Sequence, residues 1–333
     1  MLLQSLWTIY HPEIPPFLRP YLDTPPLTRL RNVGMNCGCE YTSFPLFLRT
    51  RPYSRFDHSV GTALIIWHFT GSPRQTVAGL LHDTATPVFA HVVDFLNGDH
   101  LRQESTEERT EDFIRRSPEL TALLRRDGLT MADVADYHRY PIADNPSPQL
   151  SADRLEYTLG NLWHYGFLDL APPKDFYRDL TVGTNENGDP ELAFRSPETA
   201  LAFAQAALRT SRVYVADEDR FAMQTLAETL RDALNRCVLT GDDLYTTEPE
   251  VIAKLRADSC SAGNWDRFRG LSRLQVSSEK PEEPSWLSIP AKKRYIDPLV
   301  LEKGRISRLS PEARAMQADF LALDFSVWLR AAE

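Results

Sequence analysis

Histidine and aspartate side chains inside apolar helical segments constrain this chain more than any other feature. In residues 57–69 the apolar positions recur at the spacing of a helix, and His58 stands at the start of that segment. Residues 76–82 form a second apolar helical run, which ends in the pair His82 and Asp83. Buried imidazoles and carboxylates are costly unless each has a partner, so the fold must supply partners for these groups.

A third helical segment carries another carboxylate. Leucines at positions 150, 155, 159 and 162 recur along it, and Asp153 lies within it. A single histidine on a helix is more often a satisfied core or surface residue than a metal ligand, but here two histidines and two aspartates occur in similar settings. Because a divalent cation satisfies several such groups at once, the grouping favours a shared metal site.

The types of side chain restrict the metal only in part. Two neutral imidazoles with two carboxylates suit Mn, Fe, Ni, Zn or Mg to differing degrees, so they do not select one of these ions. Cys37 and Cys39 are separated by one residue and have no second pair, and we do not expect them to bind metal. The four cysteines also lack the density of a disulfide scaffold, which predicts reduced thiols.

Composition and charge exclude several classes of protein. Of the 333 residues 42% are hydrophobic and 25% charged, which is typical of a soluble globular protein with one substantial core. The chain has no apolar run of roughly 18 residues and residues 1–16 lack the features of a secretory signal, so we expect a cytoplasmic protein without a membrane segment. The net charge of −9 argues against nucleic acid as the main partner, because such binding depends on Lys and Arg.

Further patterns predict a mostly helical chain. Residues 27–32 favour a short helix, and helices resume from residue 197 to about residue 238. Ser147 and Pro148 resemble the N-cap and first residue of the helix that carries Asp153. A capping-box pattern at residues 247–250 precedes one more helix.

Strand patterns are confined to short stretches. Residues 180–183 and 191–194 flank a turn-rich link and predict one β-hairpin. Beyond residue 262 the helical period is lost, and we expect two short strands around residues 274–276 and 294–296. The sequence therefore predicts a mostly α fold, with a helical core over residues 1–260 and a small mixed α/β extension over residues 261–333 packed on it.

Three strings carry a resemblance to a known family: Arg55-Phe56-Asp57-His58-Ser59-Val60-Gly61, Leu80-Leu81-His82-Asp83 and Ala152-Asp153-Arg154-Leu155-Glu156-Tyr157. Their order and separation resemble the motifs of HD-domain phosphohydrolases, in the branch that contains the deoxynucleoside triphosphate triphosphohydrolases. The resemblance spans roughly residues 27–260 and implies an HD-domain helical bundle.

The resemblance implies one divalent metal ion per chain, bound by His58, His82, Asp83 and Asp153, with positions left open for water and a phosphate oxygen. Such a cation lowers the pKa of bound water and neutralises charge that develops on phosphorus. His91 matches a histidine that assists at the reacting phosphate, so Asp83 and His91 are expected among the catalytic residues. The alternative for His91 is a helix-start residue without a chemical role.

Arg55, Arg154 and Tyr157 occupy positions that the resemblance assigns to substrate binding. Arg55 would hold a phosphate, as a guanidinium fork does, and Arg154 would replace a lysine beside the substrate phosphates. In the alternative interpretation both arginines only form ion pairs with neighbouring carboxylates.

Two departures from the family pattern put release of tripolyphosphate in doubt. The branch usually has a histidine where Thr86 stands, and its His-Glu-x-x-Ser/Thr motif appears here with Thr106 in place of the histidine. Glu107 keeps the glutamate and is expected to orient catalytic groups, unless it belongs to a solvated acidic helix face. His100 is a candidate substitute for a missing histidine.

Two further features bear on the substrate. The family residues that contact the sugar align with Met35 or Asn36 and with Asn161, where the residue types differ, so deoxyribose selectivity is not implied. A basic stretch at residues 292–294 could reach substrate phosphates or another subunit, although a short basic surface strand explains it equally well.

We therefore predict a metal-dependent phosphohydrolase that cleaves a phosphate ester or anhydride of a nucleotide, with a (deoxy)nucleoside triphosphate as the first expectation. The alternatives are a nucleotide monophosphatase or phosphodiesterase of the same superfamily, or a degenerate module that binds a nucleotide without turnover. A nucleotide or other phosphorylated small molecule is the expected partner, and the resemblance implies a homo-oligomer.

Overall fold

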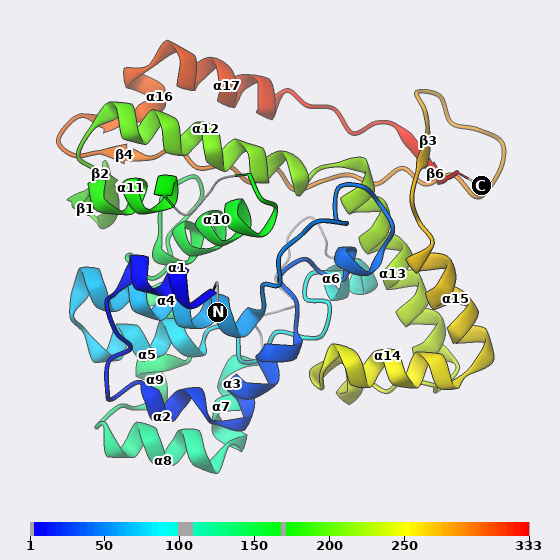
Figure 1. The fold of residues 1–333 in the computed structure, drawn as a ribbon, viewed down its shortest axis with the longest axis horizontal. Coiled ribbons are helices and arrows are strands. Elements are labelled where there is room, and N and C mark those ends of the chain that lie inside the picture. The colour runs from blue at the N-terminus through cyan, green and yellow to red at the C-terminus, as the bar shows by residue number, and fades with distance from the viewer. Residues whose placement is uncertain (1–2, 99–108, 168–170, 333) are drawn as a thin grey trace.

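The computed structural model describes residues 3–98, 109–167 and 171–332 (Figure 1). Helices predominate among them and strands are short, which confirms the predicted mostly α class with small β additions. The first half contains α1 (Leu3–Tyr10), α2 (Arg19–Leu22), α3 (Pro25–Arg29), α4 (Arg55–Thr70), α5 (Pro73–Leu81), α6 (Val92–Asn97), α7 (Thr110–Arg116), α8 (Pro118–Arg126) and α9 (Met131–Val134). The second half contains α10 (Ala152–His164), α11 (Ala171–Asp179), α12 (Pro197–Val213), α13 (Asp217–Asn235), α14 (Glu248–Ala257), α15 (Ser259–Arg269), α16 (Ile306–Leu309) and α17 (Pro311–Leu321).

Helix α4 is buried along most of its length and packs against α1, α5 and α10. Ser54 and Asp57 form a capping box at its N-terminus, and Gly71 ends it with a φ of 58°. Residues 58–66 are all buried. The capping box fixes the first turn of the helix and so places His58 beside the ends of the neighbouring helices.

Helix α5 leads directly into the candidate ligands His82 and Asp83. The Ser72 hydroxyl accepts a hydrogen bond from the Gln75 amide, and the helix ends at Leu81, so that His82 is its C-cap. A methyl group at Gly79 would clash with the side chain of Ile66 on α4. The glycine therefore permits the close approach that brings His82 next to α4.

Helix α10 begins later than the sequence pattern predicts. We expected Ser147 as the N-cap and Pro148 as the first residue, but the helix starts at Ala152 and the Ser151 hydroxyl accepts the capping hydrogen bond from the Arg154 amide. The Pro148 carbonyl instead accepts a hydrogen bond from the amide of Asp297, at 2.9 Å. This long-range backbone hydrogen bond holds Pro148 outside the helix to which the local sequence assigns it. Asp153 still lies in the first turn of α10.

The other predicted helices are present. The short helix at residues 27–32 is divided between α3 and the 3-10 helix Leu30–Asn32, and α12 and α13 cover the long helical region after residue 197. The capping box at Thr247 and Glu250 opens α14 as expected. None of the helices in the part of the chain that the structure describes is long and apolar enough to cross a membrane.

The predicted hairpin forms from β1 (Leu180–Thr184) and β2 (Pro190–Phe194), paired antiparallel. Strand β4 (Leu299–Val300) pairs parallel with β2, and β5 (Gly304–Arg305) pairs antiparallel with β4. Strand β3 (Leu274–Ser277) confirms one predicted C-terminal strand and pairs with β6 (Trp328–Ala331). The strand expected at residues 294–296 is wrong, because that segment joins no sheet and its Ile296 side chain is buried in the helical core.

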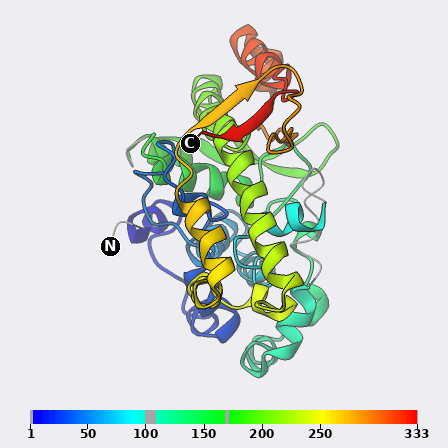
Figure 2. The same ribbon diagram turned by 90° about the vertical axis from the view of Figure 1, so that its right-hand side faces the viewer.

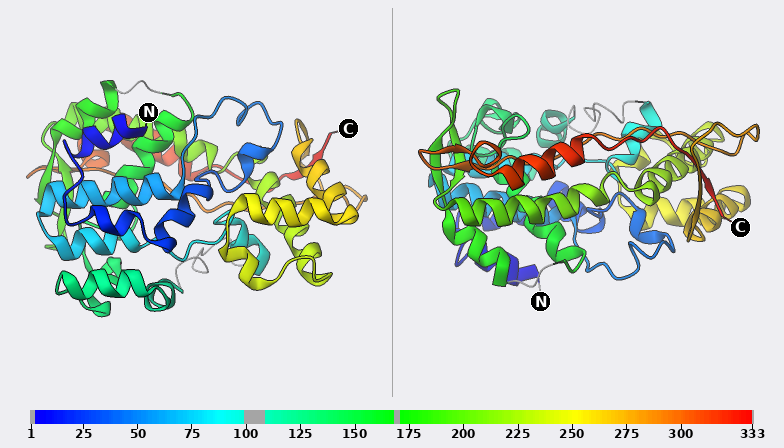
Figure 3. Two further views of the ribbon diagram at one scale, coloured as in Figure 1. Left: turned by 60° about the horizontal axis from the view of Figure 1, so that its bottom comes forward. Right: turned by 90° about the horizontal axis from the view of Figure 1, so that it is seen from above.

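Two large hydrophobic clusters divide the interior. One lies among α4, α5, α10 and α12, and the other among α6 and α13–α15, where α13 and α15 lie side by side (Figure 2). Residues of the C-terminal quarter enter both, since Val300 belongs to the first cluster and Leu329 to the second. Helix α17 also lies along α12 (Figure 3). The division at residue 260 stays a prediction.

Candidate active site

Three buried side chains from α4 and the end of α5 converge on one point. Ligand atoms of His58, His82 and Asp83 all lie within 4.8 Å of one another. The two histidine Nε2 atoms are 3.2 Å apart, and Asp83 Oδ2 lies 3.9 Å from that of His58 and 3.7 Å from that of His82. The geometry therefore brings together three of the four predicted ligands as a compact donor set.

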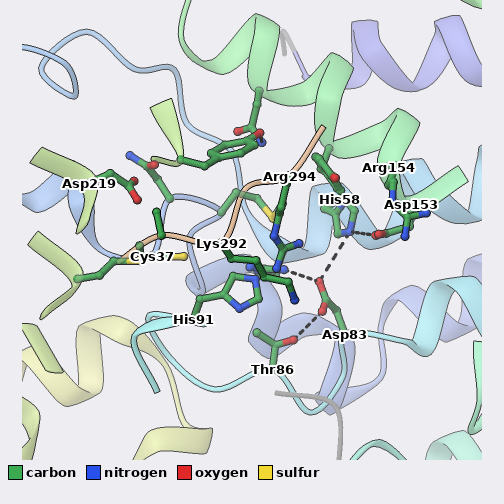
Figure 4. Close-up of a pocket in the computed structure, with 18 of the residues that line it drawn as sticks. Cys37, His58, Asp83, Thr86, His91, Asp153, Arg154, Asp219, Lys292 and Arg294 are labelled. Carbon is green, nitrogen blue, oxygen red and sulfur yellow. Dashed lines mark hydrogen bonds and ion pairs between the residues drawn. The ribbon is translucent and has the colours of Figure 1, made fainter. Parts of the chain in front are cut away.

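Asp153 approaches the same point from α10. Its Oδ1 atom lies 3.0 Å from His58 Nε2 and 3.5 Å from His82 Nε2 (Figure 4). Helices that are far apart in sequence thus place all four predicted side chains around one centre. Two imidazoles and two carboxylates are a donor set that divalent transition metals and Mg²⁺ accept.

Hydrogen bonds fix which nitrogen of each imidazole faces this centre. Nδ1 of His82 lies 2.6 Å from the carbonyl oxygen of Gly79, which only accepts, so Nδ1 carries the hydrogen. Nδ1 of His58 lies 2.6 Å from Glu156 Oε2. Both Nε2 atoms are then left with a lone pair directed at the centre in the neutral state, as in metal sites whose outer partners set the tautomer.

The electrostatics call for positive charge at the centre. Burial lowers the pKa of His58, but its hydrogen bonds with Asp153 and Glu156 outweigh this effect and raise the pKa to about 10. Burial likewise opposes ionisation of Asp83, yet the neighbouring Arg55 guanidinium and the two imidazoles hold the pKa of that carboxyl well below its usual range. A divalent cation between the four side chains would supply this positive charge to the carboxylate oxygens and to the imidazole lone pairs.

Glu156 supports His58 and was missed as a functional residue by the sequence analysis. Its carboxylate also accepts hydrogen bonds from the hydroxyls of Tyr53 and Tyr10. A methyl group at Gly61 would clash with this carboxylate, so the glycine lets α10 approach α4. The signal available in the sequence was the spacing of three residues between Asp153 and Glu156, which puts both on one helix face.

Two residues hold Asp83 in place. Arg55 Nη1 lies 3.0 Å from Asp83 Oδ2, and the Thr86 hydroxyl donates to Asp83 Oδ1 at 2.6 Å. The ion pair that we considered for Arg55 is therefore present. Thr86, which the sequence resemblance aligns with a histidine, donates its hydroxyl hydrogen to this candidate ligand.

His91 precedes α6 and is oriented by a carboxylate of that helix. Its Nδ1 lies 2.8 Å from Oδ2 of Asp94, which is fully buried. Burial is the main cause that lowers the pKa of His91 below its ordinary value. Asp94 was not predicted, although the His-x-x-Asp spacing places the two residues on one side of a turn.

A cavity of about 270 Å³ joins the donor set to the remaining candidates. Arg154 lines this cavity and lies 3.2 Å from the carboxylate of Asp144. The ion pair that was the alternative interpretation for Arg154 is therefore present. Tyr157 also lines the cavity, together with Tyr165 and Tyr214. Lys292 and Arg294 come from the segment between β3 and β4 and reach into the space beside His91 and Asp83 (Figure 4).

Met35, Asn36 and Asn161, which the sequence resemblance aligns with sugar-contacting positions, line the same cavity. The Tyr165 hydroxyl donates to Asn36 Oδ1 at 2.6 Å, and the Asn36 amide nitrogen is buried without a partner. Asn161 donates to the Tyr214 hydroxyl at 2.8 Å. This end of the cavity therefore offers aromatic faces and a buried amide donor.

The remaining candidate residues either lie outside the described part of the chain or are cysteines that we did not expect to bind metal. Glu107, Thr106 and His100 lie outside the described residues. Cys37 lines the cavity, and burial raises the pKa of its thiol to about 12, which keeps it protonated at neutral pH. Cys39 is a buried free thiol.

The fold and the site define a mostly helical protein whose buried histidine–carboxylate cluster fits a divalent metal. No family model matches the chain. Over 244 residues it is 28% identical to the uncharacterized protein YdhJ of Bacillus subtilis, covering 72% of this chain and 71% of that protein. Over 261 residues it is 25% identical to a protein of Cordyceps militaris named metal-dependent phosphohydrolase cns2, covering 75% of this chain and 72% of that one.

Proposed function

We propose that this protein is a metal-dependent phosphohydrolase of the HD-domain type. The observation that carries the proposal is the convergence of His58, His82, Asp83 and Asp153, with each imidazole Nδ1 already engaged by an acceptor. The distant similarity to a protein named a metal-dependent phosphohydrolase supports the same chemistry.

The four side chains would hold a divalent cation, which when bound lowers the pKa of water and offsets negative charge developing on phosphorus. The chain's own residues do the positioning. Glu156 and the Gly79 carbonyl keep the two Nε2 atoms directed at the centre, and Arg55 and Thr86 fix the Asp83 carboxylate. A site held this rigidly loses little free energy to reorganisation when charge develops.

His91 is the proposed proton donor or acceptor at the reacting phosphate. Asp94 engages Nδ1, so Nε2 is the atom that exchanges a proton with the substrate. Burial lowers the pKa of His91, so its imidazole is mainly neutral at neutral pH and can accept a proton through Nε2.

The proposed substrate is a nucleotide, with a (deoxy)nucleoside triphosphate as the first candidate. Arg55, Arg154, Lys292 and Arg294 supply cationic side chains to the cavity, which suits several phosphate charges. Tyr157, Tyr165 and Tyr214 add aromatic side chains to the lining of the same cavity.

A mononucleotide or cyclic nucleotide is the second candidate. The observation that favours it is the engagement of Thr86 with Asp83, because this position then offers its proton to a ligand of the metal rather than to a phosphate. Such a substrate would release orthophosphate or open a phosphodiester ring.

The test is a nucleotide panel incubated with the purified protein and Mn²⁺ or Mg²⁺, with the products separated by chromatography. Tripolyphosphate or pyrophosphate among the products supports the first candidate, and orthophosphate from mononucleotides supports the second. Asp153→Ala should abolish either product. If the wild type binds nucleotides but yields no product with any divalent ion, the chain is a binding module and the proposed activity is wrong.

A further inference from the structure

Residues 289–297 form an extended strap between β3 and β4. At one end Ile289 is buried in the cluster around α13, and its carbonyl accepts a hydrogen bond from Arg220. At the other end Ile296 is buried in the cluster around α4 and α10, and the Asp297 amide donates to the Pro148 carbonyl at 2.9 Å. The strap is therefore fixed on both sides of the cavity that its middle residues line.

The side chains of Lys292, Lys293 and Arg294 in the strap alternate in direction. Lys292 and Arg294 line the cavity. Lys293 faces away, because its ammonium group donates to the Leu321 carbonyl at the end of α17 and lies 5.4 Å from the centre of the Phe325 ring. Such alternation is the geometry of an extended chain. It places two cations on the cavity side and one on the opposite side.

The inward pair lies next to groups of the proposed reaction. Figure 4 shows Lys292 and Arg294 extending toward His91 and Asp83. The charge of Arg294 also adds to burial in lowering the pKa of His91, which indicates that the two groups are close. Arg55 and Arg154, which also line the cavity, lie 3.0 and 3.2 Å from the carboxylates of Asp83 and Asp144.

We propose that Lys292 and Arg294 bind the phosphate oxygens of the substrate, and that the strap completes the active site from the C-terminal part of the chain. The proposal rests on the proposed phosphohydrolase function and names the residues that recognise the anion. Residues two apart in an extended chain are roughly 6.6 Å apart, so the two cations can contact different phosphate groups of one ligand. A diphosphate should therefore bind more tightly than orthophosphate.

Calorimetric titration tests this with the protein as purified, using orthophosphate and methylenediphosphonate, a diphosphate that cannot be hydrolysed. Lys292→Gln and Arg294→Gln should each weaken diphosphate binding about tenfold or more, because each removes a charge-assisted hydrogen bond. Lys293→Gln changes the net charge equally on the same strap and should leave the affinity unchanged. Lys292→Arg should retain most of the affinity, and circular dichroism checks that each variant is folded.

The proposal is overturned if the wild type binds neither anion, or if the inward variants bind the diphosphate as tightly as Lys293→Gln does. The result is distinguishable from failure of the proposed function. Weaker binding in the inward variants without hydrolysis of any nucleotide by the wild type would keep the anion site and reject the activity. Normal diphosphate binding by Lys292→Gln and Arg294→Gln, with turnover by the wild type, would reject the anion site and keep the activity.

Discussion

His58 and His82 each use Nδ1 for a partner inside the protein and present Nε2 to the centre between them. The identities of these residues could be predicted, because their sequence context resembles a known motif. Their orientation could not, since it depends on the Gly79 carbonyl, which every residue has, and on Glu156, which reaches His58 only when α10 packs on α4. Contacts of this kind arise from packing and leave no mark on local composition.

His164 lies outside the candidate site and should make the stability of the protein depend on pH. Its Nδ1 donates to the Arg51 carbonyl, its Nε2 is buried without a partner, and burial lowers its pKa to about 4. The unfolded chain has the ordinary pKa of about 6.5, so between these values the unfolded state binds more protons. The folding free energy of the wild type should therefore weaken by roughly 2–3 kcal/mol as pH falls through this range.

Urea unfolding of the wild type and His164→Gln, at about pH 7 and about pH 4.5, measures this contribution. The variant should lose less stability on acidification than the wild type, because Gln does not titrate. An equal loss in both proteins would mean that His164 is not held neutral in the folded state.

Individual elements could be predicted where a long apolar period or a turn-rich link stands out in the sequence. Helices α4 and α5 follow from the apolar period and the β1–β2 hairpin from the turn, and each overlaps the residues that the sequence indicates. The start of α10 and the strand expected at residues 294–296 were wrong. Both errors concern segments on either side of one tertiary contact, the hydrogen bond between the Asp297 amide and the Pro148 carbonyl.

The two serines before α10 test this assignment directly. Ser151 is buried and its hydroxyl accepts the Arg154 amide, so Ser151→Ala should cost roughly 1 kcal/mol or more of unfolding free energy. Ser147 is exposed and caps no helix, so Ser147→Ala should change stability by no more than about 0.5 kcal/mol. Equilibrium denaturation of both variants settles the comparison, and a larger loss in Ser147→Ala would contradict the observed helix start.

At the scale of the whole molecule, the C-terminal part enters the main interior. Val300 adds a parallel strand pair to β2, and Arg305 forms a two-pronged ion pair with the fully buried Glu191 of that hairpin, at 2.6 and 2.8 Å. These contacts join residues more than 100 positions apart. The sequence patterns did not indicate which residues of the C-terminal part make these contacts.

Arg305→Met should destabilise the protein by roughly 3–5 kcal/mol, because it leaves the Glu191 carboxylate buried without its cation. Arg330 offers a matched control, since it pairs with the exposed Glu283 and its replacement by Met should cost no more than about 1 kcal/mol. Denaturant unfolding measures both. Similar small losses would show that the Arg305 pair does not attach the extension to the hairpin.

We propose that three helical regions assemble one metal site from His58, His82, Asp83 and Asp153. The most direct measurement is the metal content of the purified wild type and of Asp153→Ala by elemental analysis, with His91→Ala as a control from the same cavity. About one divalent ion per chain is expected in the wild type and in His91→Ala, and folded Asp153→Ala should lose it. A wild type that binds no divalent metal, or an Asp153→Ala variant that binds it as well as the wild type, would contradict this assignment of the ligands.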